Sequence, residues 1–193
     1  MELETIFGLP AHPLLVHLAV VLVPLAALIA VVFAFRPAWL DRFGWGLVAL
    51  SGAGAFGAVL AAGSGEGLES LQNDVETAAR EDHFEMGEMA RNLSLLFFFL
   101  VTAVVVLRYL ARRRAAAGQA PTGFWGLMAG KAGAIGIAAA LVLTASGALV
   151  TVAVAGHQGA KLAWCEETKN CPADNGGGEG TEQGDDDGDD DGD

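Results

Sequence analysis

The sequence lacks most of the features that a soluble enzyme uses. It has no glycine-rich phosphate loop after a strand, no nucleophile elbow and no Cys-x-x-Cys redox motif. Only 11 of its 193 residues are lysine or arginine, against 23 aspartates and glutamates, and they form no basic surface for a nucleic acid. Cysteine occurs twice and histidine four times. The sequence therefore does not indicate a soluble enzyme or a nucleic-acid-binding protein.

Charge is almost absent from four long windows of the sequence. Hydrophobic side chains make up 53% of the chain, and they are clustered in these windows rather than spread evenly. Each window reaches about 20 residues, the length of helix that crosses a bilayer. The sequence therefore predicts an all-α integral membrane four-helix bundle over residues 1–172, with spans at about 13–35, 43–63, 86–107 and 132–155.

The first window differs from an export signal. Its flank, Met1-Glu2-Leu3-Glu4, is acidic where a signal peptide carries positive charge, and its apolar core is too long. We therefore expect a retained helix.

The few basic residues indicate which side of the membrane each loop faces. Seven of the 11 lie in two short loops, and those loops hold a single acidic residue, Asp41. The seven are Arg36, Arg42, Arg108, Arg112, Arg113, Arg114 and Lys131. Because positive loops stay in the cytoplasm, we expect both loops inside the plasma (inner) membrane, with both termini and the central loop on the outer face.

The end of the chain has a different composition. Residues 173–193 are almost entirely glycine, aspartate and glutamate, which leaves nothing to bury and predicts a disordered acidic tail. Just before it, Cys165 and Cys171 enclose five residues on the outer side. Two nearby cysteines in an oxidising compartment favour a disulfide. A thiolate metal site is the alternative.

The four histidines are the most informative polar residues. Under the expected topology, His12, His17, His83 and His157 all lie on the outer side of the membrane. His17 falls inside an apolar stretch, where ionisable residues usually face the bundle interior and have a partner. We therefore expect His17 and His157 to face each other across the interior, with His12 and His83 in the layer just above.

Several chemistries use imidazoles from different helices. A b-type haem needs two axial ligands and small residues where the macrocycle lies. A transition-metal site would add carboxylates from the same layer, for which the candidates are Glu66, Glu85 and Glu88. A proton relay pairs a histidine with a carboxylate. The alternative is structural: histidines tolerate the membrane interface because their rings are amphipathic, and glycines let helices pack.

Two motifs resemble a known family. The opening His12-Pro13-Leu14-Leu15-Val16-His17 and the closing segment from Gly156-His157-Gln158-Gly159 to Trp164 are similar to the motifs of the bacterial membrane-protein family called domain of unknown function 2231. His83 stands where such proteins often have a lone histidine. The resemblance covers residues 8–165 and implies four helices without an established activity. Some relatives occur in respiratory or cytochrome-associated contexts, which favours redox chemistry.

Together these features lead to one leading expectation. The chain is expected to be a membrane protein whose outer histidine cluster binds a haem or a metal ion, acting as a redox or electron-transfer accessory to respiratory or other redox membrane proteins. The alternative is a cofactor-free scaffold or assembly subunit. A small transporter ranks third, because the inner halves of the spans lack the polar groups that a substrate pathway needs.

Overall fold

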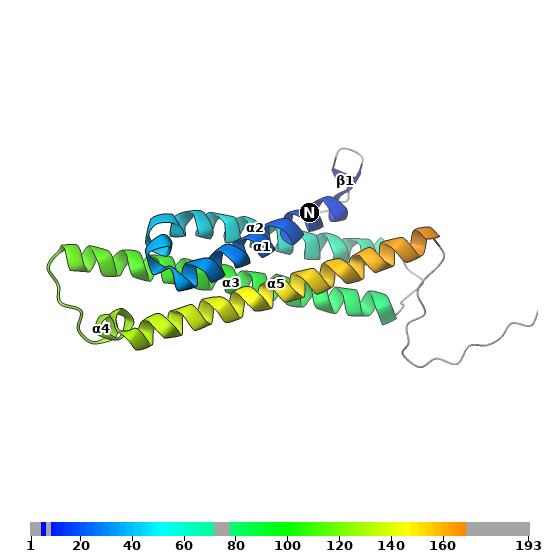
Figure 1. Ribbon diagram of the computed structural model, residues 1–193. Helices are drawn as coiled ribbons and strands as arrows, with labels where there is room; N and C mark the ends of the chain where they lie inside the picture. The colour runs from blue at the N-terminus through cyan, green and yellow to red at the C-terminus, as the bar shows by residue number, and fades with distance from the viewer. Residues whose placement is uncertain (1–4, 7–8, 72–77, 169–193) are drawn as a thin grey trace, which may run out of the picture.

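The computed structural model describes residues 5–6, 9–71 and 78–168. Within them the chain forms four long helices, one short helix and a small strand pair (Figure 1). The strands β1 (Thr5–Ile6) and β2 (Leu9–Pro10) are antiparallel. The helices are α1 (Ala11–Phe35), α2 (Pro37–Leu71), α3 (Ala78–Ala116), α4 (Phe124–Ala129) and α5 (Lys131–Thr168).

The four long helices are apolar enough to cross a membrane. Their candidate spans are Leu15–Phe35, Pro37–Gly65, Glu81–Ala116 and Lys131–Trp164. Large hydrophobic side chains cover the outside of the bundle, including Leu28, Phe56, Phe99 and Leu143. Soluble monomers rarely expose so large a contiguous apolar surface to water. The bundle is therefore a membrane protein embedded in lipid. The predicted fold class is confirmed, and each of the four expected spans falls within one long helix.

The packing order places two pairs of helices on the diagonals of the bundle. α1 packs against α2 and α5, and α3 packs against the same two helices. α1 and α3 are therefore diagonal to each other, and so are α2 and α5. Successive long helices run in opposite directions (Figure 1).

Small residues bring the helices close together. On α2, a Cβ at Gly54 would lie 3.1 Å from the backbone nitrogen of Val23, and one at Gly57 would lie 3.2 Å from that of Ala19. Gly54 and Gly57 are therefore points of close contact with the backbone of α1.

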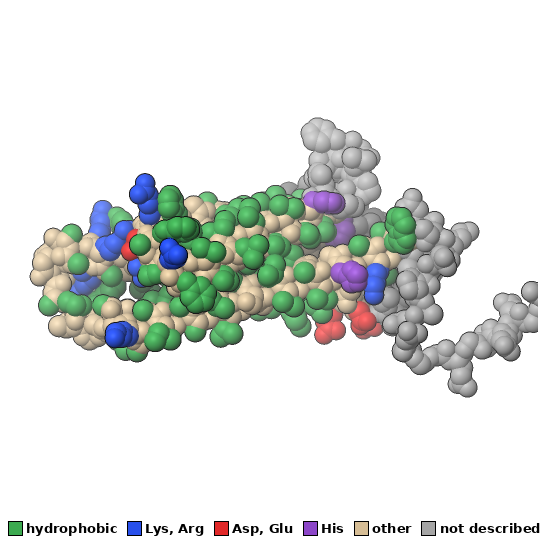
Figure 2. All heavy atoms as spheres, in the orientation of Figure 1, with side chains coloured by type: hydrophobic (Ala, Val, Ile, Leu, Met, Phe, Trp, Pro, Cys, Tyr) green, Lys and Arg blue, Asp and Glu red, His purple; other side chains and the backbone are tan. Residues whose placement is uncertain are grey.

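The two ends of the bundle differ in chemistry. Histidine side chains gather where α1 begins and α5 ends, whereas most lysine and arginine side chains gather at the opposite end (Figure 2). We call these the histidine end and the basic end. At the basic end, Arg108 of α3 donates to both carboxylate oxygens of Asp41 on α2, each at 2.8 Å. This two-pronged pair joins the helices beside the loop between α1 and α2.

Two expectations lie outside the described residues. The acidic tail, 173–193, is one, and the proposed disulfide is the other, since Cys171 is not described and only the backbone of Cys165 is, as part of α5. Both stay predictions.

Candidate functional site

His12 and His83 lie on the inner stripes of two diagonal helices. A step of seven residues is close to two helical turns, so residues seven apart share a face. Seven-residue steps from His12 reach three buried residues of α1: Ala19, Ala26 and Phe33. The same steps from His83 reach three buried residues of α3: Ala90, Phe97 and Val104. Both imidazoles therefore continue the core stripe of their helix to the histidine end.

Glycines continue the stripes of the other two helices. On α2, seven-residue steps from the buried Ser51 and Ala58 lead to Gly65, and on α5 they lead from Ala145 and Val152 to Gly159. The last core layer of the bundle thus has a histidine on each of two diagonal helices and a glycine on each of the other two. We call His12, Gly65, His83 and Gly159 the end layer.

Each ring in the end layer lies against one of these glycines. A Cβ at Gly65 would come within 3.3 Å of Cε1 of His12, and a Cβ at Gly159 within 2.9 Å of Cε1 of His83. Any side chain at either position would press on a ring. The glycines therefore give each imidazole the room to lie inside the bundle.

The hydrogen bonds of His12 fix its ring. Nδ1 lies 3.0 Å from the carbonyl oxygen of Ala61 and 3.0 Å from Oγ of Ser64, both on α2. Because a carbonyl only accepts, Nδ1 carries the proton and donates to Ala61. Burial lowers the pKa of His12 below 6.5, and the bond to Ala61 opposes that effect. His12 precedes the candidate span that begins at Leu15, and its ring is neutral at neutral pH, with an unprotonated Nε2.

His83 has one ring nitrogen without a partner. Its ring is half-buried and forms a hydrogen bond with the backbone of Ala155 on α5. Nδ1 is buried and has no hydrogen-bond partner among the described residues. The rings of His83 and His12 are near enough to interact electrostatically. Buried polar atoms normally have a partner, so this nitrogen is a candidate ligand atom.

The expectation for His17 and His157 is wrong in one respect. Both side chains are exposed, so they do not face each other in the bundle interior. The reason is helical phase: at about 100° per residue, His17 is turned about 140° from His12 around α1. His157 is turned about 200° from Gly159, whose face is inward. His17 and His157 therefore flank the bundle outside the end layer.

The candidate carboxylates do not complete a metal site within the described residues. Glu85 and Glu88 are exposed on α3, and Glu88 pairs with Arg91 at 3.4 Å. The side chain of Glu66 lies outside the described ones, although its neighbour Gly65 touches His12. No group of three or more His, Cys, Asp or Glu side chains suited to a metal ion occurs in the part of the chain that the structure describes.

Sequence reasoning missed the glycine and backbone partners of the site. The motif around His157 predicted that Gly159 would let a neighbouring helix come close, and Gly159 does contact α3, but nothing in the motif indicated that the contact would be with His83. Gly65 and Ala61 were not singled out. The seven-residue spacing back to Ala145 or to Ser51 was the signal that could have found both glycines.

A family model with the description "Predicted membrane protein (DUF2231)" matches residues 8–172. The chain belongs to this family. The family resemblance expected from the motifs is confirmed, and the matched region of this DUF2231 protein contains all four long spans and the whole end layer. No curated protein and no solved structure matches the chain.

Proposed function

We propose that this DUF2231 protein is an electron-transfer accessory of the plasma membrane, and that His12 and His83 hold a b-type haem at the histidine end. The observation that carries the proposal is the end layer, with two inward imidazoles on diagonal helices and a glycine against each ring. Bound haem would supply a reversible one-electron couple, and His12 and His83 would hold its iron, while the bundle would set its burial and its distance from partners.

The state of the ring nitrogens supports this assignment. His12 donates Nδ1–H to the carbonyl of Ala61, which leaves Nε2 unprotonated. Ligating histidines usually donate their second nitrogen in this way, which fixes the ring and raises its basicity. His83 has the corresponding pattern, with one hydrogen bond to the backbone of Ala155 and a buried Nδ1 without a described partner. Each ring therefore has one nitrogen held by backbone, and the other would serve as the ligand: Nε2 of His12 and Nδ1 of His83.

The number of ligands favours haem over an isolated metal ion. A small-metal site takes three or four protein ligands, and no such group occurs among the described residues. Haem iron takes four of its ligands from the macrocycle and needs only two from the protein. The two imidazoles of the end layer would supply those two ligands without a carboxylate.

The position of the end layer suits exchange of electrons with a partner. The layer ends the bundle, one turn or less from the limits of the candidate spans at Leu15 and Gly65. A cofactor there would lie close to the membrane surface, where a respiratory or other redox protein can approach. By the distribution of basic residues, this surface is the outer one.

The experiment is a visible spectrum of the full chain purified in detergent from cells supplied with iron and haem precursor, recorded before and after dithionite. We expect a Soret band with reducible α and β bands and about one haem per chain. A colourless protein with stoichiometric bound metal would replace haem with a metal ion. A protein with neither would overturn the proposal.

A cofactor-free scaffold is the second candidate, and one observation favours it. The bonds of His12 to Ala61 and Ser64 already join α1 to α2. In a scaffold, replacing His12 would lower the thermal stability of the protein without changing any spectrum. In a haem protein, the same replacement would also remove the colour.

A further inference from the structure

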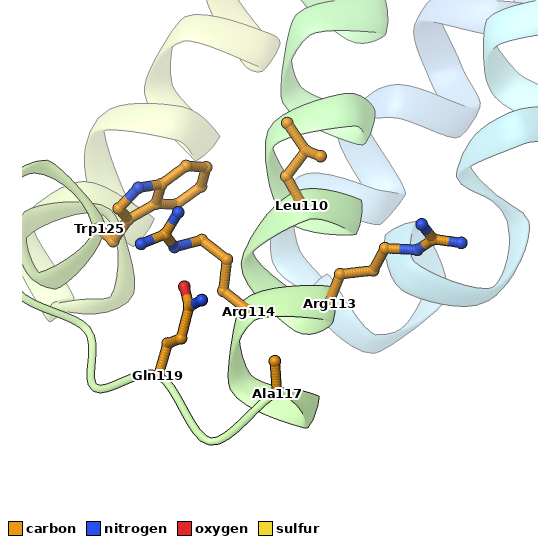
Figure 3. A pocket seen from close by; sticks show the side chains of 6 residues that line it. All are labelled: Leu110, Arg113, Arg114, Ala117, Gln119 and Trp125. Carbon is orange, nitrogen blue, oxygen red and sulfur yellow. The ribbon is translucent and has the colours of Figure 1, made fainter.

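The basic end contains a groove that the sequence did not predict. It lies between the last turns of α3 and the short helix α4, and its volume is about 280 Å³. Figure 3 shows it from close by. Its lining residues are Leu110, Arg113, Arg114, Ala117, Gln119 and Trp125.

Glycines shape this groove. Gly118, with φ +73°, ends α3 and turns the chain so that the backbone N–H of Gln119 donates to the carbonyl of Arg114 at 3.1 Å. A Cβ at Gly126 would lie 2.7 Å from the carbonyl oxygen of Pro121. A Cβ at Gly133 would lie 2.8 Å from Cα of Met128. α4 can therefore pack against α5 in this way only with glycine at these positions. This packing places Trp125 under the guanidinium of Arg114.

Arg114 supplies the charge inside the groove. Its guanidinium lies over the Trp125 ring, 5.1 Å from the centroid, and Gln119 lies beside it (Figure 3). Arg113 points away from Trp125 (Figure 3), and its guanidinium lies over Tyr109 instead. The tryptophan therefore holds one cation, Arg114, in place over the groove.

Nothing acidic in this loop neutralises that cation. Residues 108–131 contain no aspartate or glutamate. The nearest acid in the facing loop, Asp41, is taken by Arg108. Arg114 is exposed and forms no ion pair among the described residues. The groove therefore presents a positive charge and an amide, a combination that suits a phosphate oxygen.

Exposed apolar side chains lie beside the groove, on the same two helices that form it. Leu110, Phe124 and Leu127 are 41%, 54% and 62% exposed, and α4 has no buried residue. The candidate span of α3 extends through this region to Ala116. The acyl chains of a phospholipid would cover these apolar side chains, whereas a soluble phosphate compound would leave them exposed.

We propose that this groove binds the headgroup phosphate of an anionic phospholipid, with Arg114 and Gln119 on the phosphate and the acyl chains against Leu110 and Leu127. Basic residues next to spans are favourable for anionic lipids. Here the Trp125 ring holds the guanidinium of Arg114 in one position. The general attraction between basic residues and anionic lipids is thereby concentrated at one binding site. The proposal is independent of the haem at the other end.

The test is native mass spectrometry of the detergent-purified full chain, titrated with phosphatidylglycerol or with phosphatidylcholine of the same acyl chains. The test variant is Arg114→Gln and the matched control is Arg112→Gln, which removes the same charge from an arginine that does not line the groove. We expect phosphatidylglycerol to bind wild type and Arg112→Gln alike, and Arg114→Gln roughly fivefold more weakly. Phosphatidylcholine should bind all three weakly.

Equal losses in Arg114→Gln and Arg112→Gln would overturn the site, because they would show general attraction to charge. Equal binding of the two lipids to wild type would also overturn it. Displacement of the lipid by millimolar inorganic phosphate would assign the groove to a soluble phosphate instead. Arg114→Lys guards against misfolding: it keeps the charge, so it should retain more binding than Arg114→Gln.

Discussion

Gly159 of α5 lies directly against the imidazole of His83 on α3. A Cβ at position 159 would come within 2.9 Å of Cε1 and 3.4 Å of Nε2 of that ring. His83 can therefore lie inside the bundle only because residue 159 of the neighbouring helix is a glycine and has no side chain.

Gly159→Ala should displace His83 and weaken haem binding. The added methyl group forces the ring to move by several tenths of an ångström, which misaligns its ligating nitrogen. We expect lower haem occupancy and an altered reduced spectrum. Gly63→Ala is the matched control, since a Cβ there would meet nothing within 4 Å. Identical spectra for the two variants would show that the contact with Gly159 does not position the ring.

Arg108→Gln should destabilise the bundle. The variant leaves Asp41 without its two-pronged partner, and both side chains are about three-quarters buried. The loss should be about 1–2 kcal/mol, at the low end for bonds to a charged group because some solvent reaches the pair. Thermal unfolding in detergent should show a melting temperature several degrees lower, whereas Arg112→Gln should melt like wild type. Equal melting temperatures would mean that the pair contributes no stability.

The protein without haem should become less stable as the pH falls below about 6.5. Burial lowers the pKa of His12 in the folded protein, so below 6.5 the unfolded chain binds a proton that the folded chain resists. The contribution of neutral His12 to the free energy of unfolding is fully present above the pKa of His12 in the unfolded chain. It declines as the pH drops toward the lower pKa of His12 in the folded protein. Melting temperatures between about pH 7.5 and about pH 5.5 would measure this dependence.

His12→Gln is the variant that isolates this effect. Its amide can still donate to the carbonyl of Ala61, but it does not titrate. The decline in melting temperature between the two pH values should therefore be smaller than in wild type. An unchanged decline would assign the pH dependence to other groups.

The topology is also testable. With Cys165 and Cys171 replaced by serine, a cysteine introduced at Ala116 should resist an impermeant maleimide in intact cells and react after permeabilisation. One introduced at Gly180 should react in intact cells. The opposite pattern would place the histidine end in the cytoplasm and change the identity of its redox partners.

Hydropathy predicted the membrane bundle because length and apolarity are properties of the sequence itself. The four spans could be read directly, and the gathering of histidines at one end of the bundle could be predicted as well (Figure 2). Membrane depth alone, however, singled out His17. Which side of a helix faces inward depends on the packing of its neighbours, and only the buried stripe through Ala19 and Ala26 shows that His12, not His17, is inward.

The groove at the basic end could not be predicted for a different reason. The sequence shows a basic loop but does not show that Gly118 and Gly126 turn it back on itself. The contact between Arg114 and Trp125 depends on that turn. It follows from backbone geometry over a dozen residues, for which hydropathy and charge give no signal.

Under the proposed function, His12 and His83, rather than His17 and His157, hold the haem. The most direct measurement is the reduced-minus-oxidised spectrum, per mole of folded protein, of wild type and of the four single alanine variants prepared side by side. We predict that His12→Ala and His83→Ala each lose the α band, while His17→Ala and His157→Ala keep it at the wild-type intensity. Loss of the band in His17→Ala or His157→Ala with retention in His83→Ala would show that His12 and His83 are not the ligand pair. The absence of any haem band in wild type would show that the protein binds no haem.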